Sequence, residues 1–178
     1  MQLSDAERLM LALLCEIHEA SDAKGGVNSS LVKKALCSGN EWAITAEVQL
    51  PWKGDASNPP YVSHVLDVLD MWLFLEDTYA SLTAEDAVRF RRETGHEYDP
   101  QFPGFDGHSE TDECKAAQYV IEEMGRFGKF RGRSLTSQHP TIARSRRMLS
   151  VFVPIRATLG NRKPALMTAD ELISVVKA

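Results

Sequence analysis

Apolar residues recur every three or four positions along most of this chain, which is the spacing that one face of an α-helix requires. The first such run follows Ser4 and Glu7, whose spacing is that of a capping box. In a capping box each side chain bonds the other residue's backbone N–H. The pattern therefore predicts a helix over residues 5–20, with apolar positions at Ala6, Leu9, Met10, Leu13, Leu14 and Ile17.

The same signals predict helices along the rest of the chain. A second capping box, Thr168 to Glu171, predicts a terminal helix that carries Leu172 and Val176. Four more helices are expected: one capped by Asn28 or Ser29 and ended by Gly39, one from Thr83 to about Glu93, one capped by Ser109 or Thr111 and reaching about Phe127, and one opened by Pro140 with a kink or break at Pro154.

The segment from Tyr61 to Ala80 predicts the central helix, with Pro60 at its first position, where a missing N–H costs nothing. Its polar residues form one narrow stripe: Ser63, Asp67, Asp70 and Asp77. A helix that is apolar around most of its circumference is buried on several sides or forms a subunit interface. We expect this helix to lie near the interface of a homo-oligomer.

Three segments carry weaker or different signals. Residues 43–50 fit a short helix or an extended segment, Lys24 to Gly26 ends the first helix, and Pro and Gly residues predict loops over 51–60 and 95–107. A length of 178 residues favours one domain. The predicted fold is therefore all-α, a single multihelical domain of about six to eight helices over residues 1–178.

Composition excludes several classes of protein. Hydrophobic residues make up 43% and charged residues 25%, as in ordinary globular proteins. The longest apolar stretch, Val65 to Leu75, is interrupted by two aspartates, and no signal peptide is visible at the start. The cysteines, Cys15, Cys37 and Cys114, form no C-x-x-C pair. We expect a cytoplasmic protein with reduced thiols, no membrane contact, no metal and no cofactor.

Charge is divided unevenly along the chain. Residues 1–125 hold 9 Lys or Arg and 23 Asp or Glu, whereas residues 126–178 hold 11 and 2, so the net charges are −14 and +9. Such a division indicates contacts. The two parts pair with each other, within the chain or across a subunit interface, or the basic part binds an anion such as a nucleotide, a phosphorylated metabolite or nucleic acid.

Six cations form the candidate ligand-binding site. Cations alternate with Phe127 and Phe130 in residues 125–133, a pattern that suits phosphate contact with base stacking. The alternative is a helix end whose cations complement the helix dipole or pair with the acidic part. The candidate residues are Arg126, Lys129, Arg131, Arg133, Arg144 and Arg147, the last two on the helix after Pro140.

No established catalytic motif is present, so no catalytic residue is predicted and enzymatic activity stays undecided. Two further groups of titratable residues could serve catalysis or metal binding, but each also has a structural interpretation. His64, Asp67 and Asp70 share one side of the central helix and fit a solvated stripe better than an acid–base pair. A loop cluster matches no ligand motif for a metal and fits turns and helix N-termini better: His96, Asp99, Asp106, His108, Asp112 and Glu113.

Five short segments have a distinctive order and spacing: Leu3-Ser4-Asp5-Ala6-Glu7-Arg8-Leu9, Leu69-Asp70-Met71-Trp72, Gly104-Phe105-Asp106-Gly107, Arg147-Met148-Leu149 and Thr168-Ala169-Asp170-Glu171-Leu172-Ile173. Together they resemble the YfbU family of small prokaryotic proteins. The resemblance covers nearly the whole chain and is weakest over residues 20–60 and 95–102. It implies a multihelical fold and no assigned reaction. Some relatives carry a separate DNA-binding domain, which suggests a ligand-sensing or regulatory module.

These observations lead to an expected function. We expect a non-catalytic helical protein that acts by association, as a homo-oligomer or a regulatory module. The first alternative is a binding module for an anionic small molecule or nucleic acid through the basic part of the chain. The second alternative is an enzyme whose site carries no recognised motif.

Overall fold

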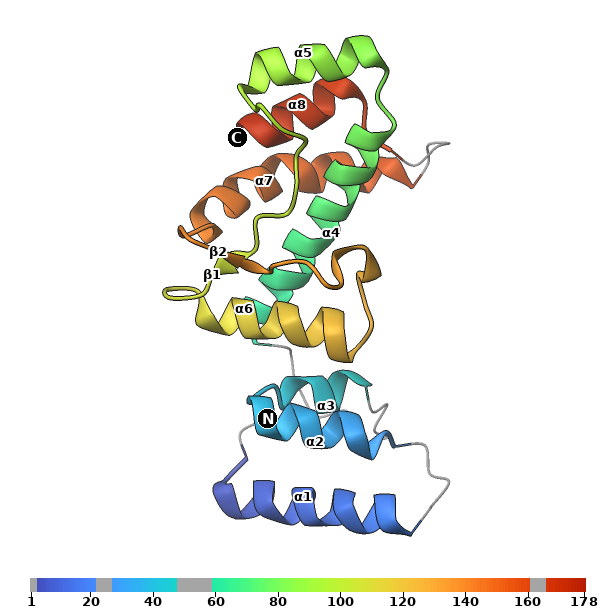
Figure 1. Cartoon of the computed structure of the whole chain (residues 1–178), viewed down its shortest axis with the longest axis vertical. Helices are drawn as coiled ribbons and strands as arrows, with labels where there is room; N and C mark the ends of the chain where they lie inside the picture. Colours follow the sequence, from blue (N-terminus) through green and yellow to red (C-terminus); the bar gives the residue numbers. More distant parts are fainter. Residues whose placement is uncertain (1–2, 22–26, 48–58, 161–165) are drawn as a thin grey trace.

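The computed structural model describes residues 3–21, 27–47, 59–160 and 166–178, and it confirms an all-α fold (Figure 1). The described residues form eight α-helices: α1 Asp5–Ala20, α2 Ser29–Ser38, α3 Trp42–Glu47, α4 Pro60–Ala80, α5 Ala84–Thr94, α6 Thr111–Gln118, α7 Ile142–Leu159 and α8 Ala169–Lys177. A π-helical turn, η1 Tyr119–Glu123, continues α6, and a 3-10 turn, η2 Gly128–Phe130, follows it. Two short strands, β1 Phe105–Asp106 and β2 Thr136–Ser137, pair in parallel.

The core lies around α4, which contacts α6, α7 and α8. Nine of its residues are buried, among them Val65, Leu69, Met71 and Leu75, which are inaccessible to solvent. Full burial of one such side chain contributes about 1.5–3 kcal/mol, so α4 anchors the fold. The structure thus shows burial on several sides for α4, and the expectation of a subunit interface near this helix stays a prediction.

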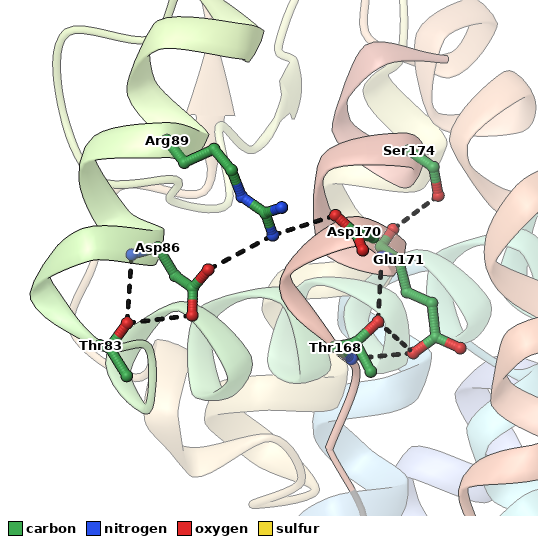
Figure 2. A network of polar contacts seen from close by, with 7 residues as sticks. All are labelled: Thr83, Asp86, Arg89, Thr168, Asp170, Glu171 and Ser174. Atoms are coloured by element: carbon green, nitrogen blue, oxygen red, sulfur yellow. Dashed lines mark hydrogen bonds and ion pairs between the residues drawn. The ribbon is translucent and has the colours of Figure 1, made fainter.

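The helices stack along the long axis of the molecule (Figure 1). At one end, α5 and α8 lie side by side and run in the same direction, and each begins at a threonine cap. Figure 2 shows how they are joined: the Arg89 guanidinium contacts Asp86 at 3.3 Å and Asp170 at 3.0 Å. At the other end, α1 packs on α2 and forms the outermost layer.

Local capping signals predicted most helix ends correctly. Both capping boxes form, and Asn28 and Thr83 cap α2 and α5. Gly39 ends α2 with a φ of 73°, a left-handed conformation that glycine adopts without strain. Residues 42–47 are helical, which decides between the two alternatives there, whereas the predictions for residues 24–26 and 51–58 lie outside the described residues.

Two predictions about the ends of α6 are wrong. Glu110, not Ser109 or Thr111, is the N-cap residue of α6, and the π-helical turn that continues α6 ends at Glu123 instead of near Phe127. A kink or a break was expected at Pro154; α7 continues through it to Leu159, so the break is excluded. The loop expected over 95–107 contains β1.

Glu110, the residue before α6, connects three segments. Its buried carboxylate accepts hydrogen bonds from the N–H groups of Asp106 at 2.8 Å, Thr141 at 2.6 Å and Ile142 at 2.8 Å. The last two belong to the beginning of α7, whose first N–H groups have no partner within the helix. A distant carboxylate therefore caps α7, and short-range sequence signals do not predict such a cap.

Candidate functional site

Glu76, a carboxylate of the central helix, organises the basic residues that the charge pattern singled out. Its side chain is 6% exposed. One guanidinium nitrogen of Arg133 donates to both of its oxygens, at 2.9 and 3.0 Å, and the N–H of Phe102 donates at 3.0 Å. Burying a carboxylate is costly unless it is paired and hydrogen-bonded, and Arg133 supplies that pairing.

Lys129 and Arg131 also contact carboxylates of the acidic part. The Nζ of Lys129 lies 2.6 Å from Asp77 and 3.6 Å from Glu76. Arg131 lies 3.7 Å from Glu122, a weaker contact between two exposed side chains. Three of the four cations between residues 126 and 133 thus pair within the chain, as the intramolecular interpretation of the charge division expects.

The remaining three candidate residues have other surroundings. Arg126 lies over the ring of Phe127, 5.6 Å from its centroid. Arg147 donates to the backbone oxygen of Ala178 at 2.7 Å and so joins α7 to the end of α8. Arg144 is exposed and forms no ion pair within the described part of the chain.

The six cations do not surround one hollow in the described structure. Arg133, Lys129 and Arg144 line three different hollows, of about 500, 440 and 530 Å³. That of Arg144 also contains Trp72 and His96, and the Nδ1 atom of His96 is buried without a hydrogen-bond partner. Anion binding by these residues stays a prediction. Among the six candidates, Arg144 is the one that the features of this hollow favour.

A fourth intramolecular pair was not singled out by the sequence. Arg156 of α7 contacts Asp70 of α4 at 3.0 Å, and its guanidinium lies 4.3 Å from the centroid of the Phe74 ring. The relevant signal was Asp70 on an otherwise apolar helix, because a charge at such a position needs a partner. Asp70 thus belongs to an ion pair between α4 and α7.

His64, near the beginning of α4, is half-buried, and its Nε2 atom has no hydrogen-bond partner. Burial, and secondarily the positive charge of Arg146, lowers the pKa of the imidazole below its ordinary value. His64 is therefore neutral at pH 7.

In the loop cluster of histidines and carboxylates between His96 and Glu113, two aspartates contact neighbouring protein groups. Asp106 accepts from the N–H of His108 at 3.0 Å and from the hydroxyl of Ser109 at 2.5 Å, and these bonds lower the pKa of its carboxyl. Asp99 pairs with Arg91 at 3.0 Å. In the described ranges, no three His, Cys, Asp or Glu side chains are placed so that they could hold a metal ion. None of the helices described there is long and apolar enough to cross a membrane.

The most unusual surface of the molecule is the outward face of α1. Five large apolar side chains there are between 50% and 63% exposed: Leu9, Met10, Leu13, Leu14 and Ile17. We call these five residues the α1 stripe. Sequence periodicity identified the same residues as the apolar face of a helix, but it could not show that this face points away from the rest of the chain.

Contacts on the opposite side of α1 fix the direction of the stripe. Cys15 is buried and Leu11 is half-buried, and both lie nearly opposite Leu13 because successive residues are about 100° apart around a helix. Two ion pairs hold α1 in place: Arg8 with Glu41 at 2.8 Å, and Glu16 with Lys33 at 3.0 Å. The helix is thus apolar on two sides, and the described residues of its own chain cover only one of them.

Comparisons with known proteins agree with the resemblance seen in the sequence. A family model described as the YfbU domain matches residues 1–178, the whole chain. No curated protein matches this chain.

Proposed function

This chain belongs to the YfbU family, and we propose from its geometry that it acts by self-association: two copies bind each other through the α1 stripe. The observation that supports this function is the set of five large apolar side chains, each at least half exposed, on one face of one helix. A helix that is apolar on opposite sides is normally covered on both. A second copy supplies that cover with a surface of the same kind.

The size of the stripe fits a small interface. Five half-exposed side chains of this size offer apolar surface on the order of 500 Å², the upper range for the largest patch on a monomer. Two copies would bury on the order of 1,000 Å², near the lower bound for a specific interface. We expect a dimer that dissociates on dilution.

Light scattering coupled to size exclusion tests this function directly. The 19.8 kDa chain should elute with twice that mass at high concentration and approach one chain mass on dilution. The double variant Leu13→Glu, Ile17→Glu places charges in the stripe and should elute as a monomer. Its circular dichroism should match that of the wild type, because both side chains face outward.

Val88 of α5 offers a matched control, since it is 64% exposed and lies outside α1. Val88→Glu should leave the mass of the wild-type dimer unchanged. A wild-type protein that has one chain mass at every concentration would refute self-association. Equal loss of mass in Val88→Glu would show that the stripe is not the interface.

As a second candidate function, we propose that an anionic small molecule binds in the hollow beside Arg144. Arg144 has no carboxylate partner among the described residues, and the hollow also contains His96, whose Nδ1 atom is buried without a hydrogen-bond partner. Of the two carboxylates in the same hollow, Glu97 and Asp99, the second is paired with Arg91. A guanidinium that is free of carboxylates binds phosphate well. Nucleic acid has less support, because three of the six candidate cations already pair with carboxylates.

Thermal shift with AMP and inorganic phosphate at two ionic strengths tests this second function. The wild type should be stabilised more at low salt, and Arg144→Ala should lose that stabilisation. Arg126→Ala removes an exposed cation elsewhere and should retain it. An equal shift in all three proteins would exclude the Arg144 hollow as the site.

A further inference from the structure

We infer that the two copies pair with their α1 helices antiparallel, around a two-fold axis that passes beside Leu13. This inference rests on the proposed self-association and specifies its geometry. The outward centre line of α1 carries Ala6, Leu9, Leu13, Ile17 and Ala20, at successive spacings of three, four, four and three residues. This spacing is symmetric about Leu13, and all five residues are exposed. Met10 and Leu14 of the α1 stripe lie beside this line, on one side of it.

Symmetry is the reason why this spacing matters. A two-fold interface uses the same patch on both subunits, with residue i of one against residue j of the other and j against i. A two-fold axis across α1 beside Leu13 makes the two helices antiparallel, and with this spacing each residue of the centre line meets another residue of the centre line. Reversal about Leu13 places Leu9 against Ile17 of the partner subunit and Leu13 against Leu13 of the partner subunit. It also places Ala6 against Ala20 of the partner subunit. Small residues thus meet at both ends, where they leave room for the two helices to approach.

Electrostatics favours the same direction. The first turn of α1 carries Asp5 and Glu7, and its last turn carries His18. The N-terminus of a helix carries a partial positive charge and its C-terminus a partial negative charge. An antiparallel pair therefore sets opposite helix ends beside each other, whereas a parallel pair would set like ends and both acidic first turns together.

The ion pairs that orient α1 leave this surface free. The carboxylate of Glu16 is bound to Lys33 of α2, and the guanidinium of Arg8 is bound to Glu41 at the beginning of α3. Both contacts join α1 to its own chain, so the approach of a second copy does not require either of them to break. The apolar centre line is therefore preformed for pairing.

Disulfide trapping distinguishes the antiparallel pair from the alternatives. The starting variant is Cys37→Ser, which removes the exposed thiol and leaves Cys15 and Cys114 buried. Leu9→Cys, Leu13→Cys and Ile17→Cys are added to it singly, with a small mass tag on the Ile17→Cys protein. Mild oxidation should cross-link Leu13→Cys with itself, and should cross-link Leu9→Cys with Ile17→Cys when the two proteins are mixed.

The geometry predicts little cross-linking of Leu9→Cys alone or Ile17→Cys alone. In the antiparallel pair the two copies of residue 17 lie about 12 Å apart along the helix axis, at 1.5 Å per residue. A disulfide needs Cα atoms within about 7 Å. Val88→Cys, whose cysteine lies outside the α1 stripe, is the control and should remain uncross-linked.

Each other result has a defined meaning. Cross-linking of Leu9→Cys and Ile17→Cys each with itself, and not with each other, indicates a parallel pair and overturns the inference. A dimer in light scattering without any of these cross-links also overturns it, while self-association stands. A monomer in light scattering refutes the proposed function and with it the inference.

Discussion

Replacing Glu76 with glutamine tests whether the charge division of the sequence serves internal pairing. The substitution keeps the shape of the side chain and an oxygen that can accept from the N–H of Phe102. It removes the negative charge that Arg133 contacts at 2.9 Å and Lys129 at 3.6 Å. Arg133 then faces a neutral amide, whereas Lys129 keeps its contact with Asp77 at 2.6 Å.

The magnitude follows from burial. Removing one partner of a fully buried ion pair costs about 3–5 kcal/mol, whereas an exposed pair contributes about 0–1 kcal/mol. The side chain of Glu76 is 6% exposed, but those of Arg133 and Lys129 are 36% and 31% exposed. Because water reaches both cations, we expect the free energy of unfolding to fall by about 2 kcal/mol, between these limits.

Urea unfolding followed by circular dichroism measures this change. The midpoint should fall while the slope with urea stays constant, because the surface exposed on unfolding is unaltered. Asp77→Asn is the matched control: it is the same chemical change at the next residue, where the side chain is 49% exposed and pairs with Lys129. It should cost less than about 0.5 kcal/mol. Equal losses in the two variants would refute the assignment of Glu76 as the buried centre of the cluster.

Two further predictions concern residues that shape the fold. Burial opposes ionisation of Glu110, but the N–H groups of Ile142, Asp106 and Thr141 outweigh it and lower the pKa of this carboxyl below its ordinary value of 4.5. The ionised carboxylate therefore contributes stability above pH 4.5, and this contribution is lost as the pH falls through the folded-state pKa. Glu110→Gln should lower the free energy of unfolding by about 1–3 kcal/mol at pH 7, and by progressively less as the pH is lowered in acid unfolding. Gly104 has a φ of 81°, and a Cβ there would overlap the backbone of Leu135, so Gly104→Ala should cost about 3 kcal/mol or more. Gly39→Ala, with a φ of 73° in open space, should cost about 1 kcal/mol, and equal midpoints for these two variants in thermal unfolding would contradict the role of close packing at Gly104.

Some features of the candidate surfaces were readable from the sequence and others were not. The apolar positions of α1 were identified, since their spacing depends only on helix geometry. The direction in which they face was not, because it depends on whether Leu11 or Leu13 packs on α2. Similarly, the excess of positive charge after residue 125 was evident, but its partner Glu76 lies 57 residues from Arg133 in the sequence. Short-range patterns carry no information about such a distance.

The sequence by itself determined the helices, because a capping box, a left-handed glycine or an apolar repeat acts within a few residues and needs no other part of the chain. Thus Ser4, Gly39 and Thr168 mark helix ends where the spacing of side chains alone places them. Tertiary structure decided which helix surfaces are buried and which stay exposed to solvent. It buried α4 within the chain, used a distant carboxylate, Glu110, to cap α7, and left the α1 stripe uncovered, because burial and pairing depend on which helices meet in space.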